Sequence, residues 1–296
     1  MKIISLEQAK KIRFSDVSIA LGTFDGLHLG HMTLINAVKN FSGTSAVFTF
    51  NSLPLDLFCA DHKPMRLFTL EEKIDAFHKT GIDYLCITSF DKKFACMDKD
   101  VFSAMILNVF SPKNIVAGYN YTYGRHALGN ADTLEKYGKE HGCNVDIISP
   151  VIFDGEPISA TRIRECIAAG SVEKANQLLG YSYSITGTVG KGKGLGSKLG
   201  FPTANIIVAK EKIIPLRGVY AVDVAVGQHM YKGVCNIGVK PTVSSGITET
   251  IEVYVVSLYE DIYGEKVSVY FNKRIRDEKK FNNIDELKAQ IAYDIY

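Results

Sequence analysis

Short apolar runs and helix-like patterns alternate over the first 180 residues of the chain. Apolar runs that predict strands lie at Val17–Leu21, Ser45–Phe50, Tyr84–Thr88, Ile115–Gly118 and Val145–Ser149. Helical patterns lie at Leu29–Val38, Leu70–Thr80, Lys99–Phe110, Ala160–Ala169 and Ser171–Leu179. Strands that alternate with helices predict a mainly parallel sheet with helices on both faces. In such sheets ligands bind beyond the carboxyl ends of the strands.

The rest of the chain has a different pattern. Runs rich in β-branched and aromatic residues follow one another without helices between them, at Tyr183–Val189, Thr203–Val208, Gly218–Val226, Met230–Ile237, Ile251–Leu258 and Val267–Asn272. Gly and Pro separate these runs, which together predict an antiparallel barrel or sandwich. A last helix is predicted from about Ile284, with Asn282 or Asn283 as its N-cap.

The change of pattern near Gly180–Ser184 predicts two domains, residues 1–180 and residues 181–296. A length of 296 residues agrees with this, at roughly 150 residues per domain. Hydrophobic residues make up 46% of the chain and charged residues 22%. Both fractions are ordinary for a soluble globular protein, which excludes a disordered tail and a collagen-like fibre.

Charge and cysteine usage narrow the range of partners and compartments. The net charge is +2, so no overall electrostatic attraction to nucleic acid or to an acidic membrane is expected. The apolar stretch Val101–Phe110 is far shorter than the ~20 residues of a membrane span, and Met1–Phe14 shows no secretory signal. The six cysteines form no C-x-x-C pair. We therefore expect six reduced thiols, mostly buried, in a cytoplasmic protein.

The first candidate site is Gly22–His31, whose sequence GTFDGLHLGH leaves a predicted strand and enters a helix. The glycines permit a close backbone approach to a ligand, and the start of a helix favours phosphate. His28 and His31 are three residues apart, so they share one helix face and are placed to donate hydrogen bonds to phosphoryl oxygens. The alternative interpretation is that these are two ordinary surface histidines without a functional role. A zinc site ranks last because no third ligand has an obvious spacing.

The second candidate lies at Ile158–Arg164, with the sequence ISATRIR, between the last predicted strand of the first domain and a helix. Ser159 or Thr161 is placed to cap that helix, and the arginines offer several donors to a phosphate. A capped helix with solvated arginines is the alternative. Beside the first motif, an anion-binding loop is the better interpretation.

The third candidate is the Lys-bearing, glycine-rich loop Gly187–Gly200, followed by Phe201–Asn205 with the sequence FPTAN. Backbone N–H groups of such a loop can cradle phosphates. The loop nearly fits the P-loop pattern, but Gly194 replaces the Ser or Thr and no helix follows, so we reject a P-loop fold. A mobile polar hairpin and a basic loop that binds nucleic acid remain open.

These motifs together resemble a known family. H-x-G-H near the start and ISATRIR near residue 160 are similar to the nucleotidyltransferase superfamily, which activates small molecules with ATP and releases pyrophosphate. With the segment Gly118–Gly124 (GYNYTYG) and the PTAN motif, they resemble the bacterial bifunctional riboflavin kinase/FMN adenylyltransferase (FAD synthetase) family over essentially the whole chain. The resemblance implies a Rossmann-like nucleotidyltransferase domain, then an antiparallel six-stranded riboflavin-kinase β-barrel with a C-terminal helix.

The resemblance also implies roles for single residues. Glu252 would be the base of the kinase, and His28 and His31 would act in adenylyl transfer. Thr203 and Asn205 would help hold Mg²⁺ on the nucleotide phosphates, which fits a cation that prefers oxygen ligands. ATP and phosphate binding is implied for Gly22, Phe24, Asp25, Gly30, Asn120, Ser159, Thr161, Arg162, Arg164, Gly190, Lys193 and Gly194. Flavin binding is implied for Arg276, Glu278 and Phe281.

The chain departs from the family at three places. The family usually has F-D-P-H-P after its second strand, whereas residues 50–54 read F-N-S-L-P, without the Asp or the His. Asn130 stands where an Asp is common, and Tyr254 where a His is frequent. The first two departures predict adenylylation that is slower than the kinase reaction.

The expected function is FAD biosynthesis, with riboflavin, FMN, FAD and ATP/ADP as ligands, Mg²⁺ as cofactor, and no nucleic-acid or membrane partner. One alternative is a riboflavin kinase whose adenylyltransferase activity is weakened or lost, which residues 51–53 motivate. An alternative of another class is a flavin-responsive regulator that binds nucleic acid. The near-neutral charge and the absence of a recognisable DNA-binding motif count against the regulator.

Overall fold

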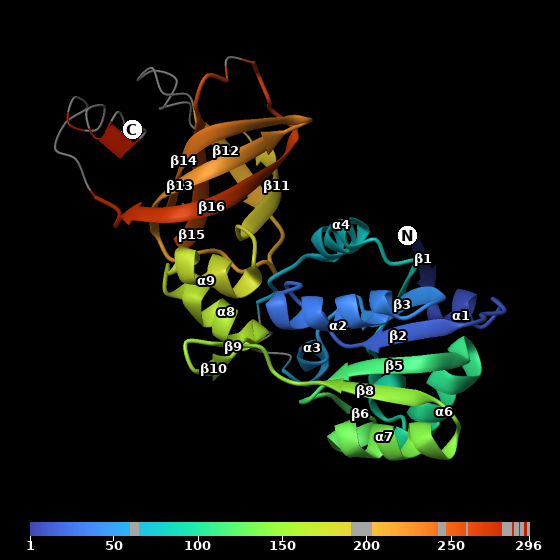
Figure 1. The fold of residues 1–296 in the computed structure, drawn as a ribbon. Helices are drawn as coiled ribbons and strands as arrows, with labels where there is room; N and C mark the ends of the chain where they lie inside the picture. Colours follow the sequence, from blue (N-terminus) through green and yellow to red (C-terminus); the bar gives the residue numbers. More distant parts are fainter. Residues whose placement is uncertain are drawn as a thin grey trace. The chain divides into compact units, whose positions relative to one another are not determined.

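The computed structural model describes residues 1–59, 65–190, 203–241, 247–258 and 260–279, together with residues 286, 290, 293 and 294. The chain forms two compact units, Met1–Ala160 and Thr161–Tyr296 (Figure 1). Most of α8 (Ala160–Ala168) and all of α9 (Val172–Leu179) group with the second unit. The predicted functional boundary near residue 180 stays a prediction.

The first unit is built on a six-stranded sheet. Its strands are β1 (Lys2–Ser5), β2 (Val17–Leu21), β3 (Thr44–Phe50), β4 (Tyr84–Thr88), β5 (Pro112–Gly118) and β8 (Asn144–Ile148). They lie in the order β1-β4-β3-β2-β5-β8, and every pair is parallel. Because β2 lies between β3 and β5, the chain winds to opposite sides of β2. A crevice at the carboxyl end of β2 is therefore expected.

Helices cover both faces of this sheet. Four of them are α2 (Leu29–Asn40), α4 (Leu70–Thr80), α6 (Lys99–Phe110) and α7 (Ala131–Glu140). Shorter elements are α1 (Leu6–Ala9), α3 (Leu55–Phe58), α5 (Lys92–Ala95), the 3₁₀ turn η1 (Arg125–Ala127), and the strand pairs β6 (Thr122–Tyr123) with β7 (Gly129–Asn130) and β9 (Ile152–Phe153) with β10 (Glu156–Pro157). The start of α4 follows from its sequence, because Thr69 and Glu72 form a capping box there.

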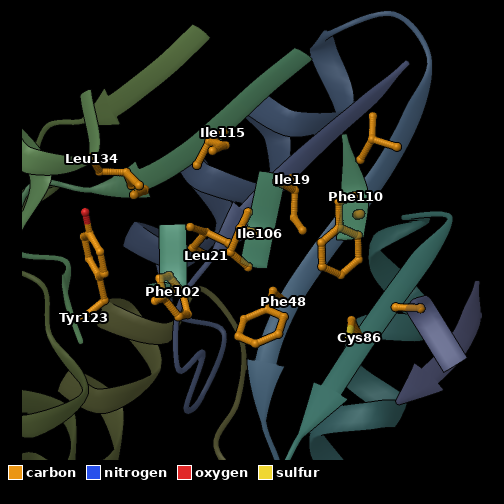
Figure 2. Packing of buried hydrophobic residues seen from close by; sticks show 14 of the residues in the cluster. Ile19, Leu21, Phe48, Cys86, Phe102, Ile106, Phe110, Ile115, Tyr123 and Leu134 are labelled. Carbon is orange, nitrogen blue, oxygen red and sulfur yellow. The ribbon is translucent and has the colours of Figure 1, made fainter. Parts of the chain in front are cut away.

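Two apolar clusters form the core of the first unit, one on each face of the sheet. In one cluster Phe102, Ile106 and Phe110 of α6 pack against alternate residues of the strands, such as Ile19 and Phe48 (Figure 2). The other cluster holds Leu34, Ile35 and Val38 of α2 with Phe77 of α4 and the intervening strand residues. All five residues of β2 are therefore buried, which explains why this strand is a continuous apolar run in the sequence.

The second unit contains a closed antiparallel barrel. Its strands are β11 (Ser184–Gly190), β12 (Thr203–Val208), β13 (Gly218–Val226), β14 (His229–Pro241), β15 (Ile247–Val255) and β16 (Lys266–Arg276). Their order is β11-β12-β15-β14-β13-β16, and β16 pairs back with β11. Residues 286, 290, 293 and 294 are helical, in agreement with the predicted C-terminal helix. The predicted fold class is confirmed for both units.

Some elements were not predicted, for identifiable reasons. The strand β1 lies at a sheet edge and buries only Ile4, so it shows no apolar alternation. The helix α7 buries only Leu134 and Gly138, which gives too thin an apolar stripe. All six cysteines are free, but Cys59 and Cys96 are exposed, so the expectation of mostly buried thiols is correct for only part of the set. The helices in the described segments are too short or too polar to cross a bilayer.

Candidate active sites

The loop between β2 and α2 places its backbone at the carboxyl end of β2. Phe24, Gly26 and Leu27 adopt left-handed backbone conformations, with φ of 49°, 87° and 37°. The ring of Phe24 is fully buried, and a Cβ on Gly22 would lie 2.9 Å from it. A side chain at residue 22 would therefore require the buried Phe24 ring to move, and the loop is compact where a ligand is expected.

His28 and His31 lie face to face at the start of α2. His28 is the N-cap, and its Nδ1 accepts a hydrogen bond from the backbone N–H of His31 at 3.3 Å. The two rings stack with their centroids 3.6 Å apart at an angle of 19°. A Cβ on Gly30 would lie 3.2 Å from the His28 ring, so the small residue permits this stacking. The structure therefore brings the two predicted histidines together.

His31 is held in its uncharged form. Burial, then the neighbouring His28, then the charge of Lys73 lower the pKa of His31 well below its usual value. Its Nδ1 is buried and makes no hydrogen bond to any described residue. A neutral imidazole carries one N–H donor and one acceptor, so near pH 7 this ring offers a single donor to a ligand.

Asp25 ties the loop to the segment that precedes α4. Its carboxylate accepts hydrogen bonds from the backbone N–H groups of Leu67, at 3.1 Å, and Phe68, at 3.0 Å. The side chain is 3% exposed, so these bonds satisfy a buried charge. The contact of Asp25 with nucleotide stays a prediction, because the structure shows the carboxylate acting on the protein backbone.

The second motif reaches the same edge of the sheet. The carbonyl oxygen of Ile158 lies 3.9 Å from the position that a Cβ on Gly30 would take, so Ser159 follows directly beside the start of α2. Thr161, Arg162 and Arg164 lie in α8, which begins at Ala160. Because they belong to the second compact unit, their contact with phosphate stays a prediction.

Asn120 lies in the turn that follows β5. The backbone N–H of Tyr121 donates to the carbonyl of Gly118 at 2.9 Å and closes the turn. The Oδ1 atom of Asn120 lies 3.3 Å from the position that a Cβ on Gly118 would take. The loop between β2 and α2, residues 22–28, is called the histidine loop below. Since β5 pairs with β2, Asn120 occupies the same edge of the sheet as this histidine loop.

The turn that departs from the family pattern is well connected. The side-chain amide of Asn51 donates to the Ser89 hydroxyl at 3.0 Å, and the side chain of Leu53 is buried. The backbone N–H of Leu53 donates to the Asp56 carboxylate at 3.1 Å, and Arg66 forms an ion pair with the same carboxylate. Neither Asn51 nor Leu53 presents a cationic donor, so neither side chain replaces the histidine that the family usually has in this turn.

Two residues of this region were missed by the sequence analysis. Arg66 donates to the carbonyl of Asn51 at 3.5 Å, and the buried Lys73 donates to two further carbonyls of the region. A signal for Lys73 was present in the sequence, because it lies four residues before Phe77 on the apolar face of α4. A lysine on such a face indicates a buried partner.

In the second unit, three polar residues from three strands lie in one row. Asn205 of β12 pairs in register with Glu252 of β15, and Glu252 pairs in turn with Asn236 of β14. Ile251 and Val253, on either side of Glu252, are buried in the barrel. Glu252 and its cross-strand partners therefore face outward from the barrel on one surface. Thr203, two residues before Asn205, lies on the same surface.

The row continues around the barrel at both ends. Gly190 pairs in register with Asn205, Asn236 pairs with Val219, and Val219 pairs with Arg276. Four residues predicted from the sequence, Gly190, Asn205, Glu252 and Arg276, thus share one belt of the barrel. The belt is not visible in the sequence, because its members come from strands that are far apart along the chain.

The predicted flavin residues have defined partners. The guanidinium of Arg276 donates from Nε at 3.1 Å and from Nη2 at 2.6 Å to the carboxylate of Asp294. A Cβ on Gly238 would lie 2.1 Å from Oε1 of Glu278 and 3.3 Å from Nδ2 of Asn236, so Glu278 lies beside the belt.

The other predicted residues of this site cannot be placed. Lys193, Gly194 and Phe281 lie outside the described residues. The described residues hold no cluster of three or more His, Cys, Asp or Glu with metal-binding geometry.

Comparison with known proteins identifies the family. A family model described as FAD synthetase matches residues 10–162, and one described as riboflavin kinase matches residues 179–296. The chain is 35% identical over 282 residues to the bifunctional riboflavin kinase/FMN adenylyltransferase of Escherichia coli (strain K12), covering 93% of this chain and 90% of that protein. The protein of the same name from Bacillus subtilis (strain 168) is 36% identical over 300 residues, covering 99% and 92%. The chain belongs to the bifunctional riboflavin kinase/FAD synthetase family.

A solved structure supports the fold of this family member. It is named a macrolide-efflux protein from Streptococcus pneumoniae, and it superposes with a TM-score of 0.89 at 32% identity, over 99% of this chain and 97% of that chain. The resemblance inferred from the sequence motifs is thereby confirmed at the level of the family and the enzyme class. The roles of single residues stay predictions.

Proposed function

We propose that this chain converts riboflavin into FAD in two ATP-dependent steps. The second unit would phosphorylate riboflavin to FMN, and the first unit would adenylylate FMN to FAD with release of pyrophosphate. The observation that supports the proposal is that the family model for each reaction matches a segment with one pair of neighbouring polar residues, the stacked His28 and His31 or the paired Asn205 and Glu252.

Glu252 is the base of the proposed kinase step. The carboxylate would take the proton from the 5′-hydroxyl of the riboflavin ribityl chain as this oxygen attacks the γ-phosphate of ATP. The bond between the γ-phosphorus and the bridging oxygen breaks, and ADP leaves. No covalent enzyme intermediate is needed, because positioning and charge neutralisation supply most of the catalysis.

The outer surface of β12 fits a magnesium ion on the nucleotide. Thr203 and Asn205 offer a hydroxyl and an amide oxygen, and Asn205 lies in register with the Glu252 carboxylate. These hard oxygen donors suit Mg²⁺, which keeps water and phosphate oxygens in its remaining positions. The ion would neutralise charge on the phosphates. The protein residues would orient it relative to Glu252.

The stacked histidines serve the proposed adenylyl transfer. A phosphate oxygen of FMN would attack the α-phosphorus of ATP, and pyrophosphate would leave. The backbone N–H groups at the start of α2 and one N–H of each imidazole would donate to the phosphoryl oxygens as charge develops on them.

The buried Leu53 favours a second version of this function, in which adenylylation is present but slower than phosphorylation. Among the described residues, we find no feature that favours a regulator that binds nucleic acid. Macrolide efflux appears only in the name of the Streptococcus pneumoniae structure, and we do not propose it for this chain. Riboflavin, FMN, FAD and ATP/ADP are thus the proposed ligands, and the six free cysteines support the cytoplasm as the compartment.

One assay tests the proposal. The full chain is incubated with riboflavin, ATP and Mg²⁺, and the flavins are separated by chromatography over time. We expect FMN to accumulate transiently and FAD to follow. FMN without FAD would leave only the kinase half of the proposal, and the absence of both products would overturn it.

A further inference from the structure

Lys73 is a buried lysine on α4 that connects two strand ends of the first unit. It is 5% exposed, and its Nζ donates to the carbonyl of Thr23 at 2.8 Å and to the carbonyl of Phe50 at 2.9 Å. Thr23 lies in the histidine loop, and Phe50 is the last residue of β3. A buried ammonium group is costly unless it is well bonded, so its position calls for an explanation beyond packing.

The backbone at Thr23, which Lys73 contacts, is fixed by more than one hydrogen-bond donor. The carbonyl of Thr23 also accepts a hydrogen bond from the Thr49 hydroxyl at 2.9 Å. The next residue but one, Asp25, binds the backbone N–H groups of Leu67 and Phe68. The backbone that leads into the two histidines is therefore anchored to β3 and to the segment before α4.

Charged groups near Lys73 come from the loop after β2, from the segment before α4 and from α4 itself. Asp25 comes from the loop and Arg66 from the segment before α4, while Glu72, its neighbour on α4, accepts from the backbone N–H of Thr69 at 2.9 Å. Burial, followed by the repulsion of Arg66, lowers the pKa of Lys73 to about 8, although Asp25 acts in the opposite direction. Most of the lysine is thus charged near pH 7.

The same ammonium group acts on His31. Its charge is one of three causes that lower the pKa of that histidine, after burial and the stacked His28. Lys73 therefore affects both the position of the histidine loop and the charge of one of its rings.

We propose that Lys73 is a positioning residue of the adenylyltransferase site. It holds the loop after β2 against the end of β3 through its two hydrogen bonds, and its charge adds to the burial and the neighbouring His28 that disfavour a charged His31. An arriving nucleotide phosphate then meets a fixed backbone and a neutral N–H donor. This inference rests on the proposed FMN adenylylation, but the state of His31 is measurable without it.

Three substitutions in the full chain test the role. Lys73→Met removes the charge and the two hydrogen bonds, whereas Lys73→Arg keeps the charge. Lys39→Met is the matched control, because Lys39 of α2 also donates to a backbone carbonyl, that of Thr80 at 2.5 Å, away from the histidine loop. The measurements are kcat and KM for FMN adenylylation over about pH 5 to 9, riboflavin phosphorylation, and the NMR titration of the His31 ring.

We expect Lys73→Met to lower kcat for adenylylation by roughly 10-fold or more, with less effect on KM, because the residue orients the site without touching substrate. The His31 titration midpoint should rise in this variant and stay low in Lys73→Arg. The wild type should lose activity above about pH 8, as Lys73 loses its proton, and Lys73→Arg should move this alkaline loss to higher pH. Lys39→Met and the kinase reaction of every variant should match the wild type.

The outcomes test the positioning role of Lys73 separately from the proposed adenylylation of FMN. Unchanged adenylylation and an unchanged His31 midpoint in folded Lys73→Met would overturn the inference. Equal losses in Lys73→Met and Lys73→Arg with no change at His31 would also overturn it, since they indicate a purely structural role. If Lys73→Met does not fold, the pH dependence of adenylylation by Lys73→Arg tests the inference, and an alkaline loss at the same pH as in the wild type would overturn it. A wild-type chain that makes no FAD from FMN would overturn the proposed function, and the His31 titration would still test the inference.

Discussion

Individual side chains in this protein have more than one structural or electrostatic role. The His28 ring caps α2, stacks on His31 and lowers the pKa of that ring. Glu252 lies in register between Asn205 and Asn236 on the outer surface of the barrel, where it is the proposed base of the kinase reaction. The two candidate groups lie in different compact units, so substitutions at each should separate the two reactions.

Replacement of the proposed kinase base should affect one reaction only. Glu252→Gln keeps the shape of the side chain and removes its basicity, so FMN production should fall by about 100-fold or more. Conversion of supplied FMN to FAD should persist, as measured by chromatography of the flavins. Glu249→Gln is the control on the same strand, because Glu249 is exposed and pairs only loosely with Arg217, at 3.7 Å. Equal loss of both reactions in folded Glu252→Gln would contradict two independent sites.

Replacement of His31 should have the reverse effect. His31→Ala removes a donor to the phosphoryl oxygens, and we expect FAD formation to fall by roughly 100-fold while riboflavin phosphorylation is unchanged. Initial rates of each half-reaction give the comparison. His141→Ala, at an exposed histidine that also stacks on an aromatic ring, should leave both rates unchanged. Normal FAD formation by His31→Ala would exclude this ring from the reaction.

At the scale of elements, strand register and turn chemistry decide which groups meet. The pairing of β12, β15 and β14 places Asn205, Glu252 and Asn236 on one surface, and a slip of one residue in β15 would turn Glu252 into the barrel. In the first unit, the turn after β3 is held by Asp56 and Arg66. This turn is therefore a defined element whose sequence can be rebuilt.

Restoring the family's turn should speed FAD formation. The combination of Leu53→His, Asn51→Asp and Ser52→Pro would add a donor near the phosphates, and one such donor is typically worth about 2 to 4 kcal/mol of transition-state stabilisation. The kinase rate should not change. Leu55→His adds a histidine at an exposed position nearby and should give no gain. A natural chain that already forms FAD rapidly, without gain from the rebuilt turn, would mean that another group, such as Arg66, fills the role.

At the scale of the molecule, two cores divide the chain. The helix α9 packs against the barrel strand β16, where the Asn176 side chain donates to the carbonyl of Phe271 at 2.8 Å and accepts from the backbone N–H of Tyr183 at 2.7 Å. Val172, Ala175, Leu178 and Leu179 of this helix are buried. The segment before residue 181 thus stabilises the barrel.

A fragment that begins near Tyr181 should fold and make FMN from riboflavin, because the barrel is closed without the first unit. A fragment that begins at Thr161 should be more stable to denaturant, since it keeps the buried face of α9. Urea unfolding and FMN chromatography give the two readouts. A folded fragment without kinase activity would show that the barrel is not an independent catalyst.

The sequence by itself determined the motifs and those elements that have a clear apolar pattern. The ranges of α4, β4, α6, β12 and β13 agree with the predicted ones residue for residue, because local apolar periodicity and helix caps depend on near neighbours in the chain. The motifs around His28, Ser159 and Thr203 were sufficient to indicate the family, since their residues are contiguous.

Tertiary structure alone decided which of these residues meet. The belt from Gly190 through Asn205 and Glu252 to Arg276 depends on pairing between strands that are distant in sequence, and no local pattern encodes such pairing. The ion pair of Arg276 with Asp294 and the two carbonyls that hold Lys73 depend on the same long-range packing. The physical reason is that a polar side chain shows its chemistry in the sequence, whereas its partner is set by where the buried apolar faces place the backbone.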